Sequence, residues 1–338
     1  MGNDRPREWS QIIRLPNLMS SSVNRSQGAI ADLTKEVKQG DRLALISLCI
    51  ALISVSFAPI FIKLSELELG ANATVFNRLF FFFIIFGFGR FCQSRISPTE
   101  PVQEIQAITR QQWLLLIGVG AVAITSLVLW AISLQYTTVA KSMLLNNLTP
   151  IFTSLGSWLW LDKKFDRRFL IGMTIALVGA IALGLEDING SAGTLLGDSY
   201  ALLSAVFLGL YFLIVEQLRS RFSATTILLW RCGIGSLLLL PLVFLIEGQL
   251  FPQTLNTWLA VLGLALISEG LGQRLLAQSM DKLSSSFVSL FLLLEPMVSA
   301  LLAWCIFNEA LNLITGIAFI IVFSGIYLAK TSQAAVAE

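Results

Sequence analysis

Long apolar runs alternate with short polar segments between Leu43 and Ala329, and each run has the length of a membrane-spanning helix. Crossing a bilayer core of roughly 30 Å takes about 20 apolar residues in a helix, because backbone groups must be hydrogen-bonded internally in hydrocarbon. The pattern predicts an all-α integral membrane protein. Ten transmembrane helices are expected, over Leu43–Ile62, Ala73–Gly89, Trp113–Leu134, Val139–Leu161, Phe169–Leu185, Leu196–Val215, Thr226–Ile246, Trp258–Met280, Ser284–Phe307 and Leu311–Ala329.

The basic residues predict how these helices are oriented. With the amino terminus in the cytoplasm, 19 of the 23 lysines and arginines fall on the cytoplasmic side, Lys63 and Lys141 fall outside, and Arg78 and Arg231 lie within spans. Cytoplasmic loops of membrane proteins carry an excess of positive charge. We therefore expect both termini in the cytoplasm and location in a bacterial inner (plasma) membrane.

The second five spans repeat the first five in sequence. Matching residues recur at nearly constant spacing: Pro150 with Pro296 and Gly179 with Gly325 at 146, and Arg78 with Arg231 at 153. Because each copy has an odd number of spans, the second must enter the membrane from the opposite side. We expect two inverted five-helix repeats, residues 43–185 and 196–330, flanked by a disordered cytoplasmic arm over 1–42 and a cytoplasmic tail over 331–338.

Short motifs occur in a fixed order along both repeats. They are Leu134-Gln135-Tyr136-Thr137, Leu148-Thr149-Pro150, Gly197-Asp198, Leu294-Glu295-Pro296 and Asn308-Glu309. On these motifs, residues 43 to 330 resemble the EamA family of the drug/metabolite transporter superfamily, although Leu161-Asp162-Lys163 stands where the family more often has a Gly-Glu pair. The resemblance implies a ten-helix bundle around a central cavity that moves small metabolites by alternating access, and it does not fix the substrate.

Composition argues against enzyme chemistry. The chain is 55% hydrophobic and 13% charged, contains no histidine, and places its four cysteines in or beside apolar runs, where small packing residues are expected. No Walker, Gly-x-Ser-x-Gly or metal-ligand pattern is present. We expect no enzyme activity, no cofactor, no metal site and no nucleic-acid partner.

Two carboxylates stand near the middle of predicted spans, Glu269 in the eighth and Glu295 in the ninth. A charge at that depth costs about 3 kcal/mol on insertion scales and is usually functional. Both are candidates for reversible protonation or for holding a cationic group of a substrate. Alternatively, Glu295 is a neutral, hydrogen-bonded helix contact, or either acid pairs permanently with Arg231 or Arg274.

The fourth and ninth spans each contain a proline. Pro150 and Pro296 remove one helical hydrogen bond each, which is predicted to free the carbonyls of Asn146 and Leu292 as ligands. Asn146 and Asn147 add polar side chains to the same turn and are candidates for the substrate pathway. The alternative is that the asparagines join two helices.

Two further polar positions and two arginines complete the set of candidates. Ser54 and Tyr211 occupy polar or irregular positions of the first and sixth spans and are candidates for lining the pathway, although helix packing is an alternative role for the serine. Arg78 and Arg231 lie about a turn inside their spans. They are expected either to extend to the two membrane interfaces or to form a gate or ion pair.

Together these observations predict a secondary transporter that exports small metabolites or amino acids by alternating access, with possible proton coupling. Its expected partners are a small-molecule substrate, protons and the lipid bilayer, and it is expected to be a monomer or homodimer. The alternatives are a passive facilitative carrier, a membrane-embedded lipid-modifying enzyme, and a sensor or assembly factor that binds ligand without transport.

Overall fold

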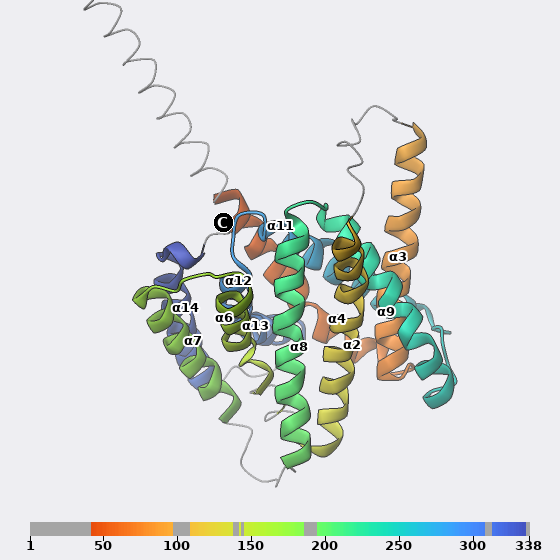
Figure 1. The fold of residues 1–338 in the computed structure, drawn as a ribbon. Coiled ribbons are helices and arrows are strands. Elements are labelled where there is room, and N and C mark those ends of the chain that lie inside the picture. Colours follow the sequence, from red (N-terminus) through yellow and green to blue (C-terminus); the bar gives the residue numbers. More distant parts are fainter. Residues whose placement is uncertain are drawn as a thin grey trace, which may run out of the picture. The chain divides into compact units, whose positions relative to one another are not determined.

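A computed structural model describes residues 42–96, 109–137, 142, 145–185, 195–307 and 313–335, and every regular element within them is a helix (Figure 1). The contacts discussed below lie within one compact unit, Ala44–Glu338. The predicted amino-terminal arm and the Asn308-Glu309 motif fall outside the described residues.

The first helix covers residues 42–56. The elements that follow are α2 (Ala58–Ser65), α3 (Ala71–Ile96), α4 (Arg110–Tyr136), α6 (Thr149–Trp160), α7 (Arg167–Leu185), α8 (Leu195–Arg219), α9 (Ala224–Ile246), α10 (Leu255–Gly263), the π-helix η3 (Leu264–Gln273), α11 (Arg274–Ser279), α12 (Ser285–Phe291), the 3-10 helix η4 (Leu292–Leu294), α13 (Glu295–Phe307), α14 (Leu313–Lys330) and the 3-10 turn η5 (Gln333–Ala335).

Seven helical segments among the described residues are long and apolar enough to cross a membrane. They are Arg42–Ser65, Ala71–Cys92, Arg110–Ser133, Leu195–Arg219, Ala224–Ile246, Leu255–Ser279 and Ser285–Ile306. The prediction of an all-helical, multi-pass membrane protein is confirmed. The predicted fifth span lies within α7, while the predicted fourth and tenth spans include residues that the structure does not describe, so ten spans stays a prediction.

Prolines set several of the helix boundaries. Pro59 and Pro150 each stand in the first turn of a helix, α2 and α6, where the missing N–H has no helical partner to lose. Pro296 stands at the same place in α13, directly after the 3-10 turn η4. Pro241 is different, because it lies inside α9. The first and ninth spans are therefore each built from consecutive short helices.

Close approach of glycines brings pairs of helices together. α7 packs along α14, and α3 packs along α9, as Figure 1 shows at its left and right sides. A Cβ added to Gly172 would stand 2.5 Å from the carbonyl oxygen of Gly325, and one added to Gly325 would stand 2.5 Å from the backbone nitrogen of Ala176. Small residues at helix interfaces are typical of membrane proteins, where dispersion contacts replace the hydrophobic effect between helices.

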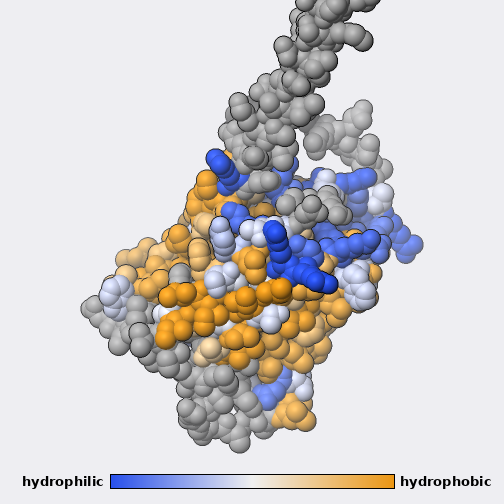
Figure 2. All heavy atoms as spheres, turned by 90° about the vertical axis from the view of Figure 1, so that its left-hand side faces the viewer, coloured by the Kyte–Doolittle hydropathy of each residue, from blue (hydrophilic) through white to orange (hydrophobic). Residues whose placement is uncertain are grey.

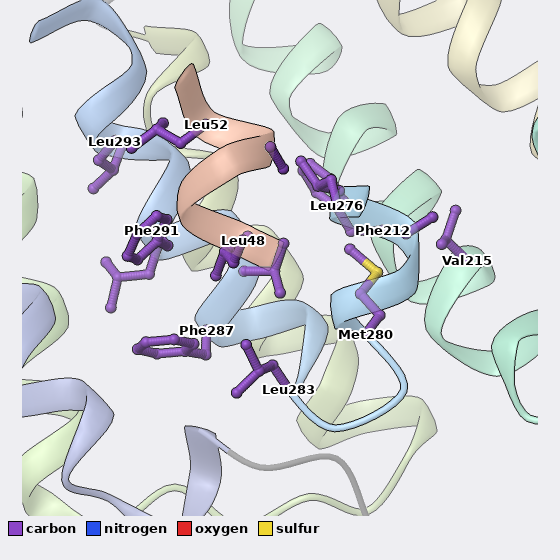
Figure 3. Close-up of a cluster of buried hydrophobic side chains, with 14 of the residues drawn as sticks. Leu48, Leu52, Phe212, Val215, Leu276, Met280, Leu283, Phe287, Phe291 and Leu293 are labelled. Atoms are coloured by element: carbon purple, nitrogen blue, oxygen red, sulfur yellow. The ribbon is translucent and has the colours of Figure 1, made fainter. Parts of the chain in front are cut away.

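The largest apolar cluster joins helices from distant parts of the sequence (Figure 3). Leu48 and Leu52 of the first helix meet Phe212 and Val215 of α8 and a group from the ninth and eighth spans, which includes Leu276, Met280, Leu283, Phe287 and Phe291. These side chains are buried, several of them completely. The cluster lies where the two halves of the sequence pack on each other.

The outer surface is apolar. Figure 2 shows a broad band of hydrophobic residues across one face, with hydrophilic residues gathered above it. Large apolar side chains of α7 and α14 are strongly exposed, including Ile171, Val178, Ile320 and Phe323. Such a surface is stable only in contact with lipid chains.

Candidate functional site: a buried charge cluster

Glu269 is completely buried in the middle of the eighth span, on the π-helix η3. The span is interrupted here: α10 ends at Gly263, the π-helical segment follows, and α11 resumes α-helical bonding at Arg274. π-helical turns inside α-helices occur frequently at functional sites, because the wider turn changes the direction of side chains. The hydrophobicity pattern gave no sign of this segment.

Two arginines from different helices pair with this one carboxylate. Arg78 of α3 donates from Nε to Oε2 of Glu269 over 2.8 Å, and Arg231 of α9 donates from Nη1 to Oε1. Each arginine side chain retains 16% of its accessible surface, whereas Glu269 has none. The carboxylate therefore binds α3, α9 and η3 together at mid-span.

Tyr211 and Cys232 complete the surroundings of the cluster. The guanidinium carbon of Arg231 lies 5.1 Å from the centre of the Tyr211 ring, a cation–π contact. The Cys232 thiol donates a hydrogen bond of 3.4 Å to Oε1 of Glu269. Cys232 was predicted only as a packing residue, because nothing along the sequence connects it to an acid 37 positions away.

Of the two alternatives given for the arginines, the structure shows the ion pair and not extension to opposite interfaces. Both turn inward because a buried carboxylate attracts them far more strongly in a low-dielectric interior than in water. Of the alternatives foreseen for Glu269, pairing with Arg231 is observed. Its second partner is Arg78 rather than Arg274. Arg78 and Arg231 occupy matching positions of the two repeats, and this was the one feature of the sequence that connected them.

Glu295 lies beside the cluster but has a different environment. Its carboxylate has no hydrogen-bond or ion-pair partner among the described residues, and its side chain is only half-buried. Arg78 is close enough to interact with it electrostatically. The backbone around it is tied to the first helix, because Ser56 Oγ donates to the Glu295 carbonyl over 3.4 Å and Ser299 Oγ donates to the Ser56 carbonyl over 3.1 Å.

The two prolines interrupt their spans as predicted, yet the carbonyls that they were expected to free have partners. The Asn146 carbonyl accepts a hydrogen bond of 2.6 Å from Thr149 Oγ1, and the Leu292 carbonyl accepts from the Glu295 N–H. Both groups are satisfied within their own turn, so the prediction that they are open ligands is wrong. A hydroxyl three residues later and a 3-10 bond replace the lost helical bonds.

Of the polar candidates, only Tyr211 lies at the charge cluster, and the asparagines and Ser54 lie in other helix contacts. The Asn146 side chain is half-buried and accepts a hydrogen bond of 3.5 Å from Ser204 Oγ of α8, while Asn147 is half-buried in the adjacent turn. Ser54 donates from Oγ to the Ile50 carbonyl within its own helix, and Ser268 of η3 donates to the Ser54 carbonyl over 3.3 Å. Tyr211 belongs to the charge cluster.

Salt bridges connect elements at the end where α8 finishes and α9 begins. Lys163 Nζ lies 2.5 Å from Oε1 of Glu216, whose Oε2 accepts from the Ser285 N–H at the start of α12 over 3.1 Å. Arg219 pairs with Asp281. These contacts join the segment after α6, the end of α8 and the start of α12.

At the other end of α9, two carboxylates cap helices. Glu247 accepts from the backbone N–H groups of Asn72 and Ala73 at the start of α3, over 2.9 and 2.8 Å. Burial, and to a smaller extent the negative charge of Glu247, raises the pKa of Glu66. Glu68 accepts from Thr254 at the start of α10, and hydrogen bonds from Thr254 and Thr257, together with the N–H groups of Gln253 and Thr254, lower the pKa of Glu68 to about 2.

Grooves that open on the described surface include two that lie away from the cluster. One, of about 580 Å³, lies between α2 and α10 and includes Phe61, Leu64 and Thr257. The other, of about 310 Å³, lies between the start of α4 and the end of α8 and includes Gln112 and Arg221. No group of histidine, cysteine and acidic side chains suited to a metal ion occurs within the described part of the chain.

The chain as a whole is similar to known proteins. The model of the EamA-like transporter family matches residues 42–185 and 195–331, nearly the whole chain. The chain belongs to the EamA-like transporter family. This EamA-like protein is thus an integral, multi-pass membrane protein of a family of transporters, and a small-molecule substrate follows from that membership.

Individual relatives are distant. The EamA-like protein is 24% identical over 206 residues to an uncharacterized transporter of Archaeoglobus fulgidus, covering 60% of this chain and 70% of the relative. It is 26% identical over 200 residues to the uncharacterized transporter YetK of Bacillus subtilis, covering 57% of this chain and 60% of YetK. It is 24% identical over 230 residues to the pseudopaline exporter CntI of Pseudomonas aeruginosa, covering 67% and 78%.

The fold of the described chain is similar to that of another protein whose crystal structure has been solved. It superimposes with a TM-score of 0.69 at 18% identity, over 85% of this chain and 96% of the other. At this identity the likeness concerns the arrangement of helices and not the substrate.

Proposed function

We propose that the EamA-like protein is a secondary transporter that exports a small metabolite by alternating access, in exchange for protons. The observation that carries the proposal is the central cluster, in which Glu269 pairs with two arginines, together with the nearby Glu295, whose carboxylate has no partner among the described residues. Similarity to an exporter, CntI, supports the direction of transport.

The proposal includes ten spans arranged as two inverted repeats, and equivalent hydrogen bonds support it. Ser126 Oγ of α4 donates to the Ser204 carbonyl of α8 over 2.9 Å. Ser268 Oγ of η3 donates to the Ser54 carbonyl of the first helix over 3.3 Å. Ser54 and Ser204 occupy matching positions of the two repeats. The first bond runs from the first half of the sequence to the second, and the second bond runs from the second half to the first. Such exchange is expected of a twofold relation.

Glycine contacts between α7 and α14 support the same relation. A Cβ on Gly179 would stand 2.8 Å from Val322, and a Cβ on Gly325 would stand 2.5 Å from the backbone of Ala176. The spacing of 146 converts Gly179 into Gly325 and Ala176 into Val322. The two contacts are therefore made by equivalent residues of the two repeats.

The orientation proposed from the basic residues places the Lys163–Glu216 and Arg219–Asp281 pairs on the cytoplasmic side of a bacterial inner membrane, with both termini on that side. The Glu68 and Glu247 caps then face outward. Opening toward the cytoplasm has to separate Lys163 from Glu216, because this pair joins α8 to the segment after α6. Alternating access accordingly begins with the breaking of these salt bridges.

Glu295 is the proposed coupling residue. A carboxylate with no partner among the described residues can take up a proton or the ammonium group of a substrate, but not both at once. Competition of this kind produces exchange, because a proton must leave before the substrate binds. Glu269 is unsuited to this role, since two guanidinium groups hold it as an anion.

The test is transport by the purified protein in proteoliposomes, after comparison of metabolites in cells with and without it has identified a substrate. We expect an imposed pH gradient to drive flux and an uncoupler to abolish the gradient-driven part. Glu295→Gln should abolish the dependence of flux on pH and weaken the binding of a substrate that carries an ammonium group, whereas Glu68→Gln, which changes a carboxylate in a loop, should behave like the wild type. Flux that ignores both the gradient and uncouplers would identify a facilitative carrier instead.

The remaining alternatives give different results in the same preparation. A lipid-modifying enzyme would change the chemical identity of a bilayer lipid, and a sensor would bind a metabolite without moving it. Either result contradicts the proposal.

A further inference from the structure

Two buried hydrogen-bond donors at the cluster have no acceptor among the described residues. They are the phenol hydroxyl of Tyr211 and the Nε–H of Arg231. Tyr211 is 2% exposed, so its hydroxyl has no ready access to bulk water. Leaving a buried donor unpaired costs about 1–3 kcal/mol, and native proteins rarely do so without a reason.

The two unpaired donors belong to side chains that touch. Arg231 lies over the Tyr211 ring at 5.1 Å from its centre, and only the Nη1 atom of Arg231 is engaged by Glu269. A guanidinium presents five N–H groups in a planar fork, and one edge of this fork accommodates a whole carboxylate. The pairing with Glu269 does not use the edge that carries Nε, and the buried Nε–H makes no hydrogen bond to a described residue.

Arg78 differs from Arg231 in how its Nε–H is used. Arg78 donates its Nε to Glu269, so the corresponding edge of that side chain is occupied. Two positive and one negative charge meet at the centre of the cluster, with Glu295 as the further acid beside Arg78. When Glu295 is protonated or paired with an ammonium group, one positive charge at the cluster remains without an anion.

We infer that Arg231 and Tyr211 form a binding site for the carboxylate group of the substrate. The Nε edge of Arg231 and the Tyr211 hydroxyl donate to the carboxylate oxygens, while Glu269 stays on Nη1 and keeps the guanidinium in place. This inference rests on the proposed function and names the chemical group by which the substrate is held. With an ammonium group at Glu295, the substrate is a small zwitterion.

The experiment measures ligand binding without any gradient. The thermal unfolding midpoint of the purified full-length protein in detergent is titrated with sodium propionate, with propionamide and with sodium chloride at matched concentrations. A carboxylate that binds only the native state raises the midpoint in proportion to its affinity. We expect propionate to raise the midpoint, and the uncharged amide and chloride to have little effect.

Tyr211→Phe is the decisive variant, because the hydroxyl that it removes has no hydrogen-bond partner in the described part of the chain. We expect the stability of the unliganded variant to be unchanged or higher, and the affinity for propionate to fall about tenfold or more, the loss typical of one hydrogen bond to a charged group. Tyr327→Phe, at an exposed position of α14, is the matched control and should bind propionate as the wild type does.

The inference is overturned if propionate has no effect, if propionamide or chloride equals it, or if Tyr211→Phe binds propionate with unchanged affinity. These results are separable from failure of the proposed function. Glu295→Gln should lose pH-dependent flux and keep its Tyr211-dependent binding of propionate. A protein that binds propionate in this way but moves no metabolite would retain the carboxylate site and lose the transport proposal.

Discussion

α4 and the segment formed by α10, η3 and α11 occupy the third and eighth predicted spans, and they differ where it matters for function. Both begin at a threonine N-cap, Thr109 in one and Thr254 in the other, and both donate a serine hydrogen bond to the neighbouring helix. Only the second contains a π-helix and a buried carboxylate. Counting from the serines, the position of Glu269 corresponds to Leu127 in α4.

The comparison indicates a division of labour between two similar spans. α4 keeps regular helical bonding over its whole length and packs firmly on α8. The eighth span gives up regular bonding at η3 and brings one acid to two arginines. Of two spans with similar ends and similar serine contacts, α4 therefore packs as a regular helix, and the segment formed by α10, η3 and α11 carries the acid of the charge cluster.

The largest expected effect concerns the residue that distinguishes the two spans. Glu269→Gln leaves Arg78 and Arg231 buried without their anion, and we expect it to lower the free energy of unfolding by about 3–5 kcal/mol. Glu295→Gln removes an acid that has no partner among the described residues and should change stability by less than about 1 kcal/mol. Thermal unfolding of both variants in detergent checks this. Equal losses would show that the ion pairs contribute nothing specific to stability.

Packing around η3 gives the next effect. A Cβ on Gly272 would stand 2.8 Å from Cγ1 of Val55 and 3.1 Å from its backbone nitrogen, so Gly272→Ala should destabilise the protein by about 1–3 kcal/mol. Gly118 of α4 has open space beside it, and Gly118→Ala should raise stability by up to about 1 kcal/mol through helix propensity. The unfolding midpoints decide between them, and a stable Gly272→Ala would mean that η3 does not lie tightly against the first helix.

How far the sequence predicts this molecule depends on the range of the interaction. Apolar runs are local, so the helical membrane fold follows from hydropathy, and the order of short motifs identifies the family. The partners of Glu269 are not local: Arg78 precedes it by 191 positions and Arg231 by 38. An arginine a turn inside a span can reach the interface at little cost, and only a fold that offers a buried acid makes the inward direction better.

The π-helix and the satisfied proline turns were beyond the sequence for a different reason. In a π-helix each backbone hydrogen bond spans five residues instead of four. The eighth span is apolar on its lipid-facing side as well as on its buried side, so its hydrophobic pattern is too uniform to reveal this difference. The hydroxyl of Thr149 bonds to Asn146 only because Pro150 has already broken the helix there. The sequence predicts where the helix is interrupted, whereas the geometry of the turn determines which groups donate to the carbonyls left without a helical hydrogen bond.

The serine bonds test the equivalence of the two spans. Ser126 and Ser204 exchange hydrogen bonds in both directions, at 2.9 and 2.8 Å, whereas Ser268 donates to Ser54 over 3.3 Å without a return bond. We expect Ser126→Ala to cost about 1 kcal/mol of unfolding free energy and Ser268→Ala about half as much. The reverse order, measured by the same unfolding assay, would contradict the view that α4 is the more rigid partner.

The smallest effect concerns the caps at which the two spans begin. The Thr109 cap of α4 is completed by the neutral Gln112. At the Thr254 cap of α10, the backbone N–H and the hydroxyl of Thr254 donate to the ionised Glu68. Because folding lowers the pKa of Glu68 from 4.5 to about 2, its contribution is fully present above pH 4.5 and is lost as the pH falls toward 2. The difference in unfolding midpoint between wild type and Glu68→Gln should therefore shrink across this interval. Gln112→Ala disturbs the neutral cap, and its unfolding midpoint should differ from that of the wild type by the same amount at every pH. Glu66 also titrates, but all three proteins contain it, so its contribution is the same in each and drops out of the differences. A pH-independent difference for Glu68→Gln would mean that its carboxylate does not hold the start of α10, and the two caps would then be alike.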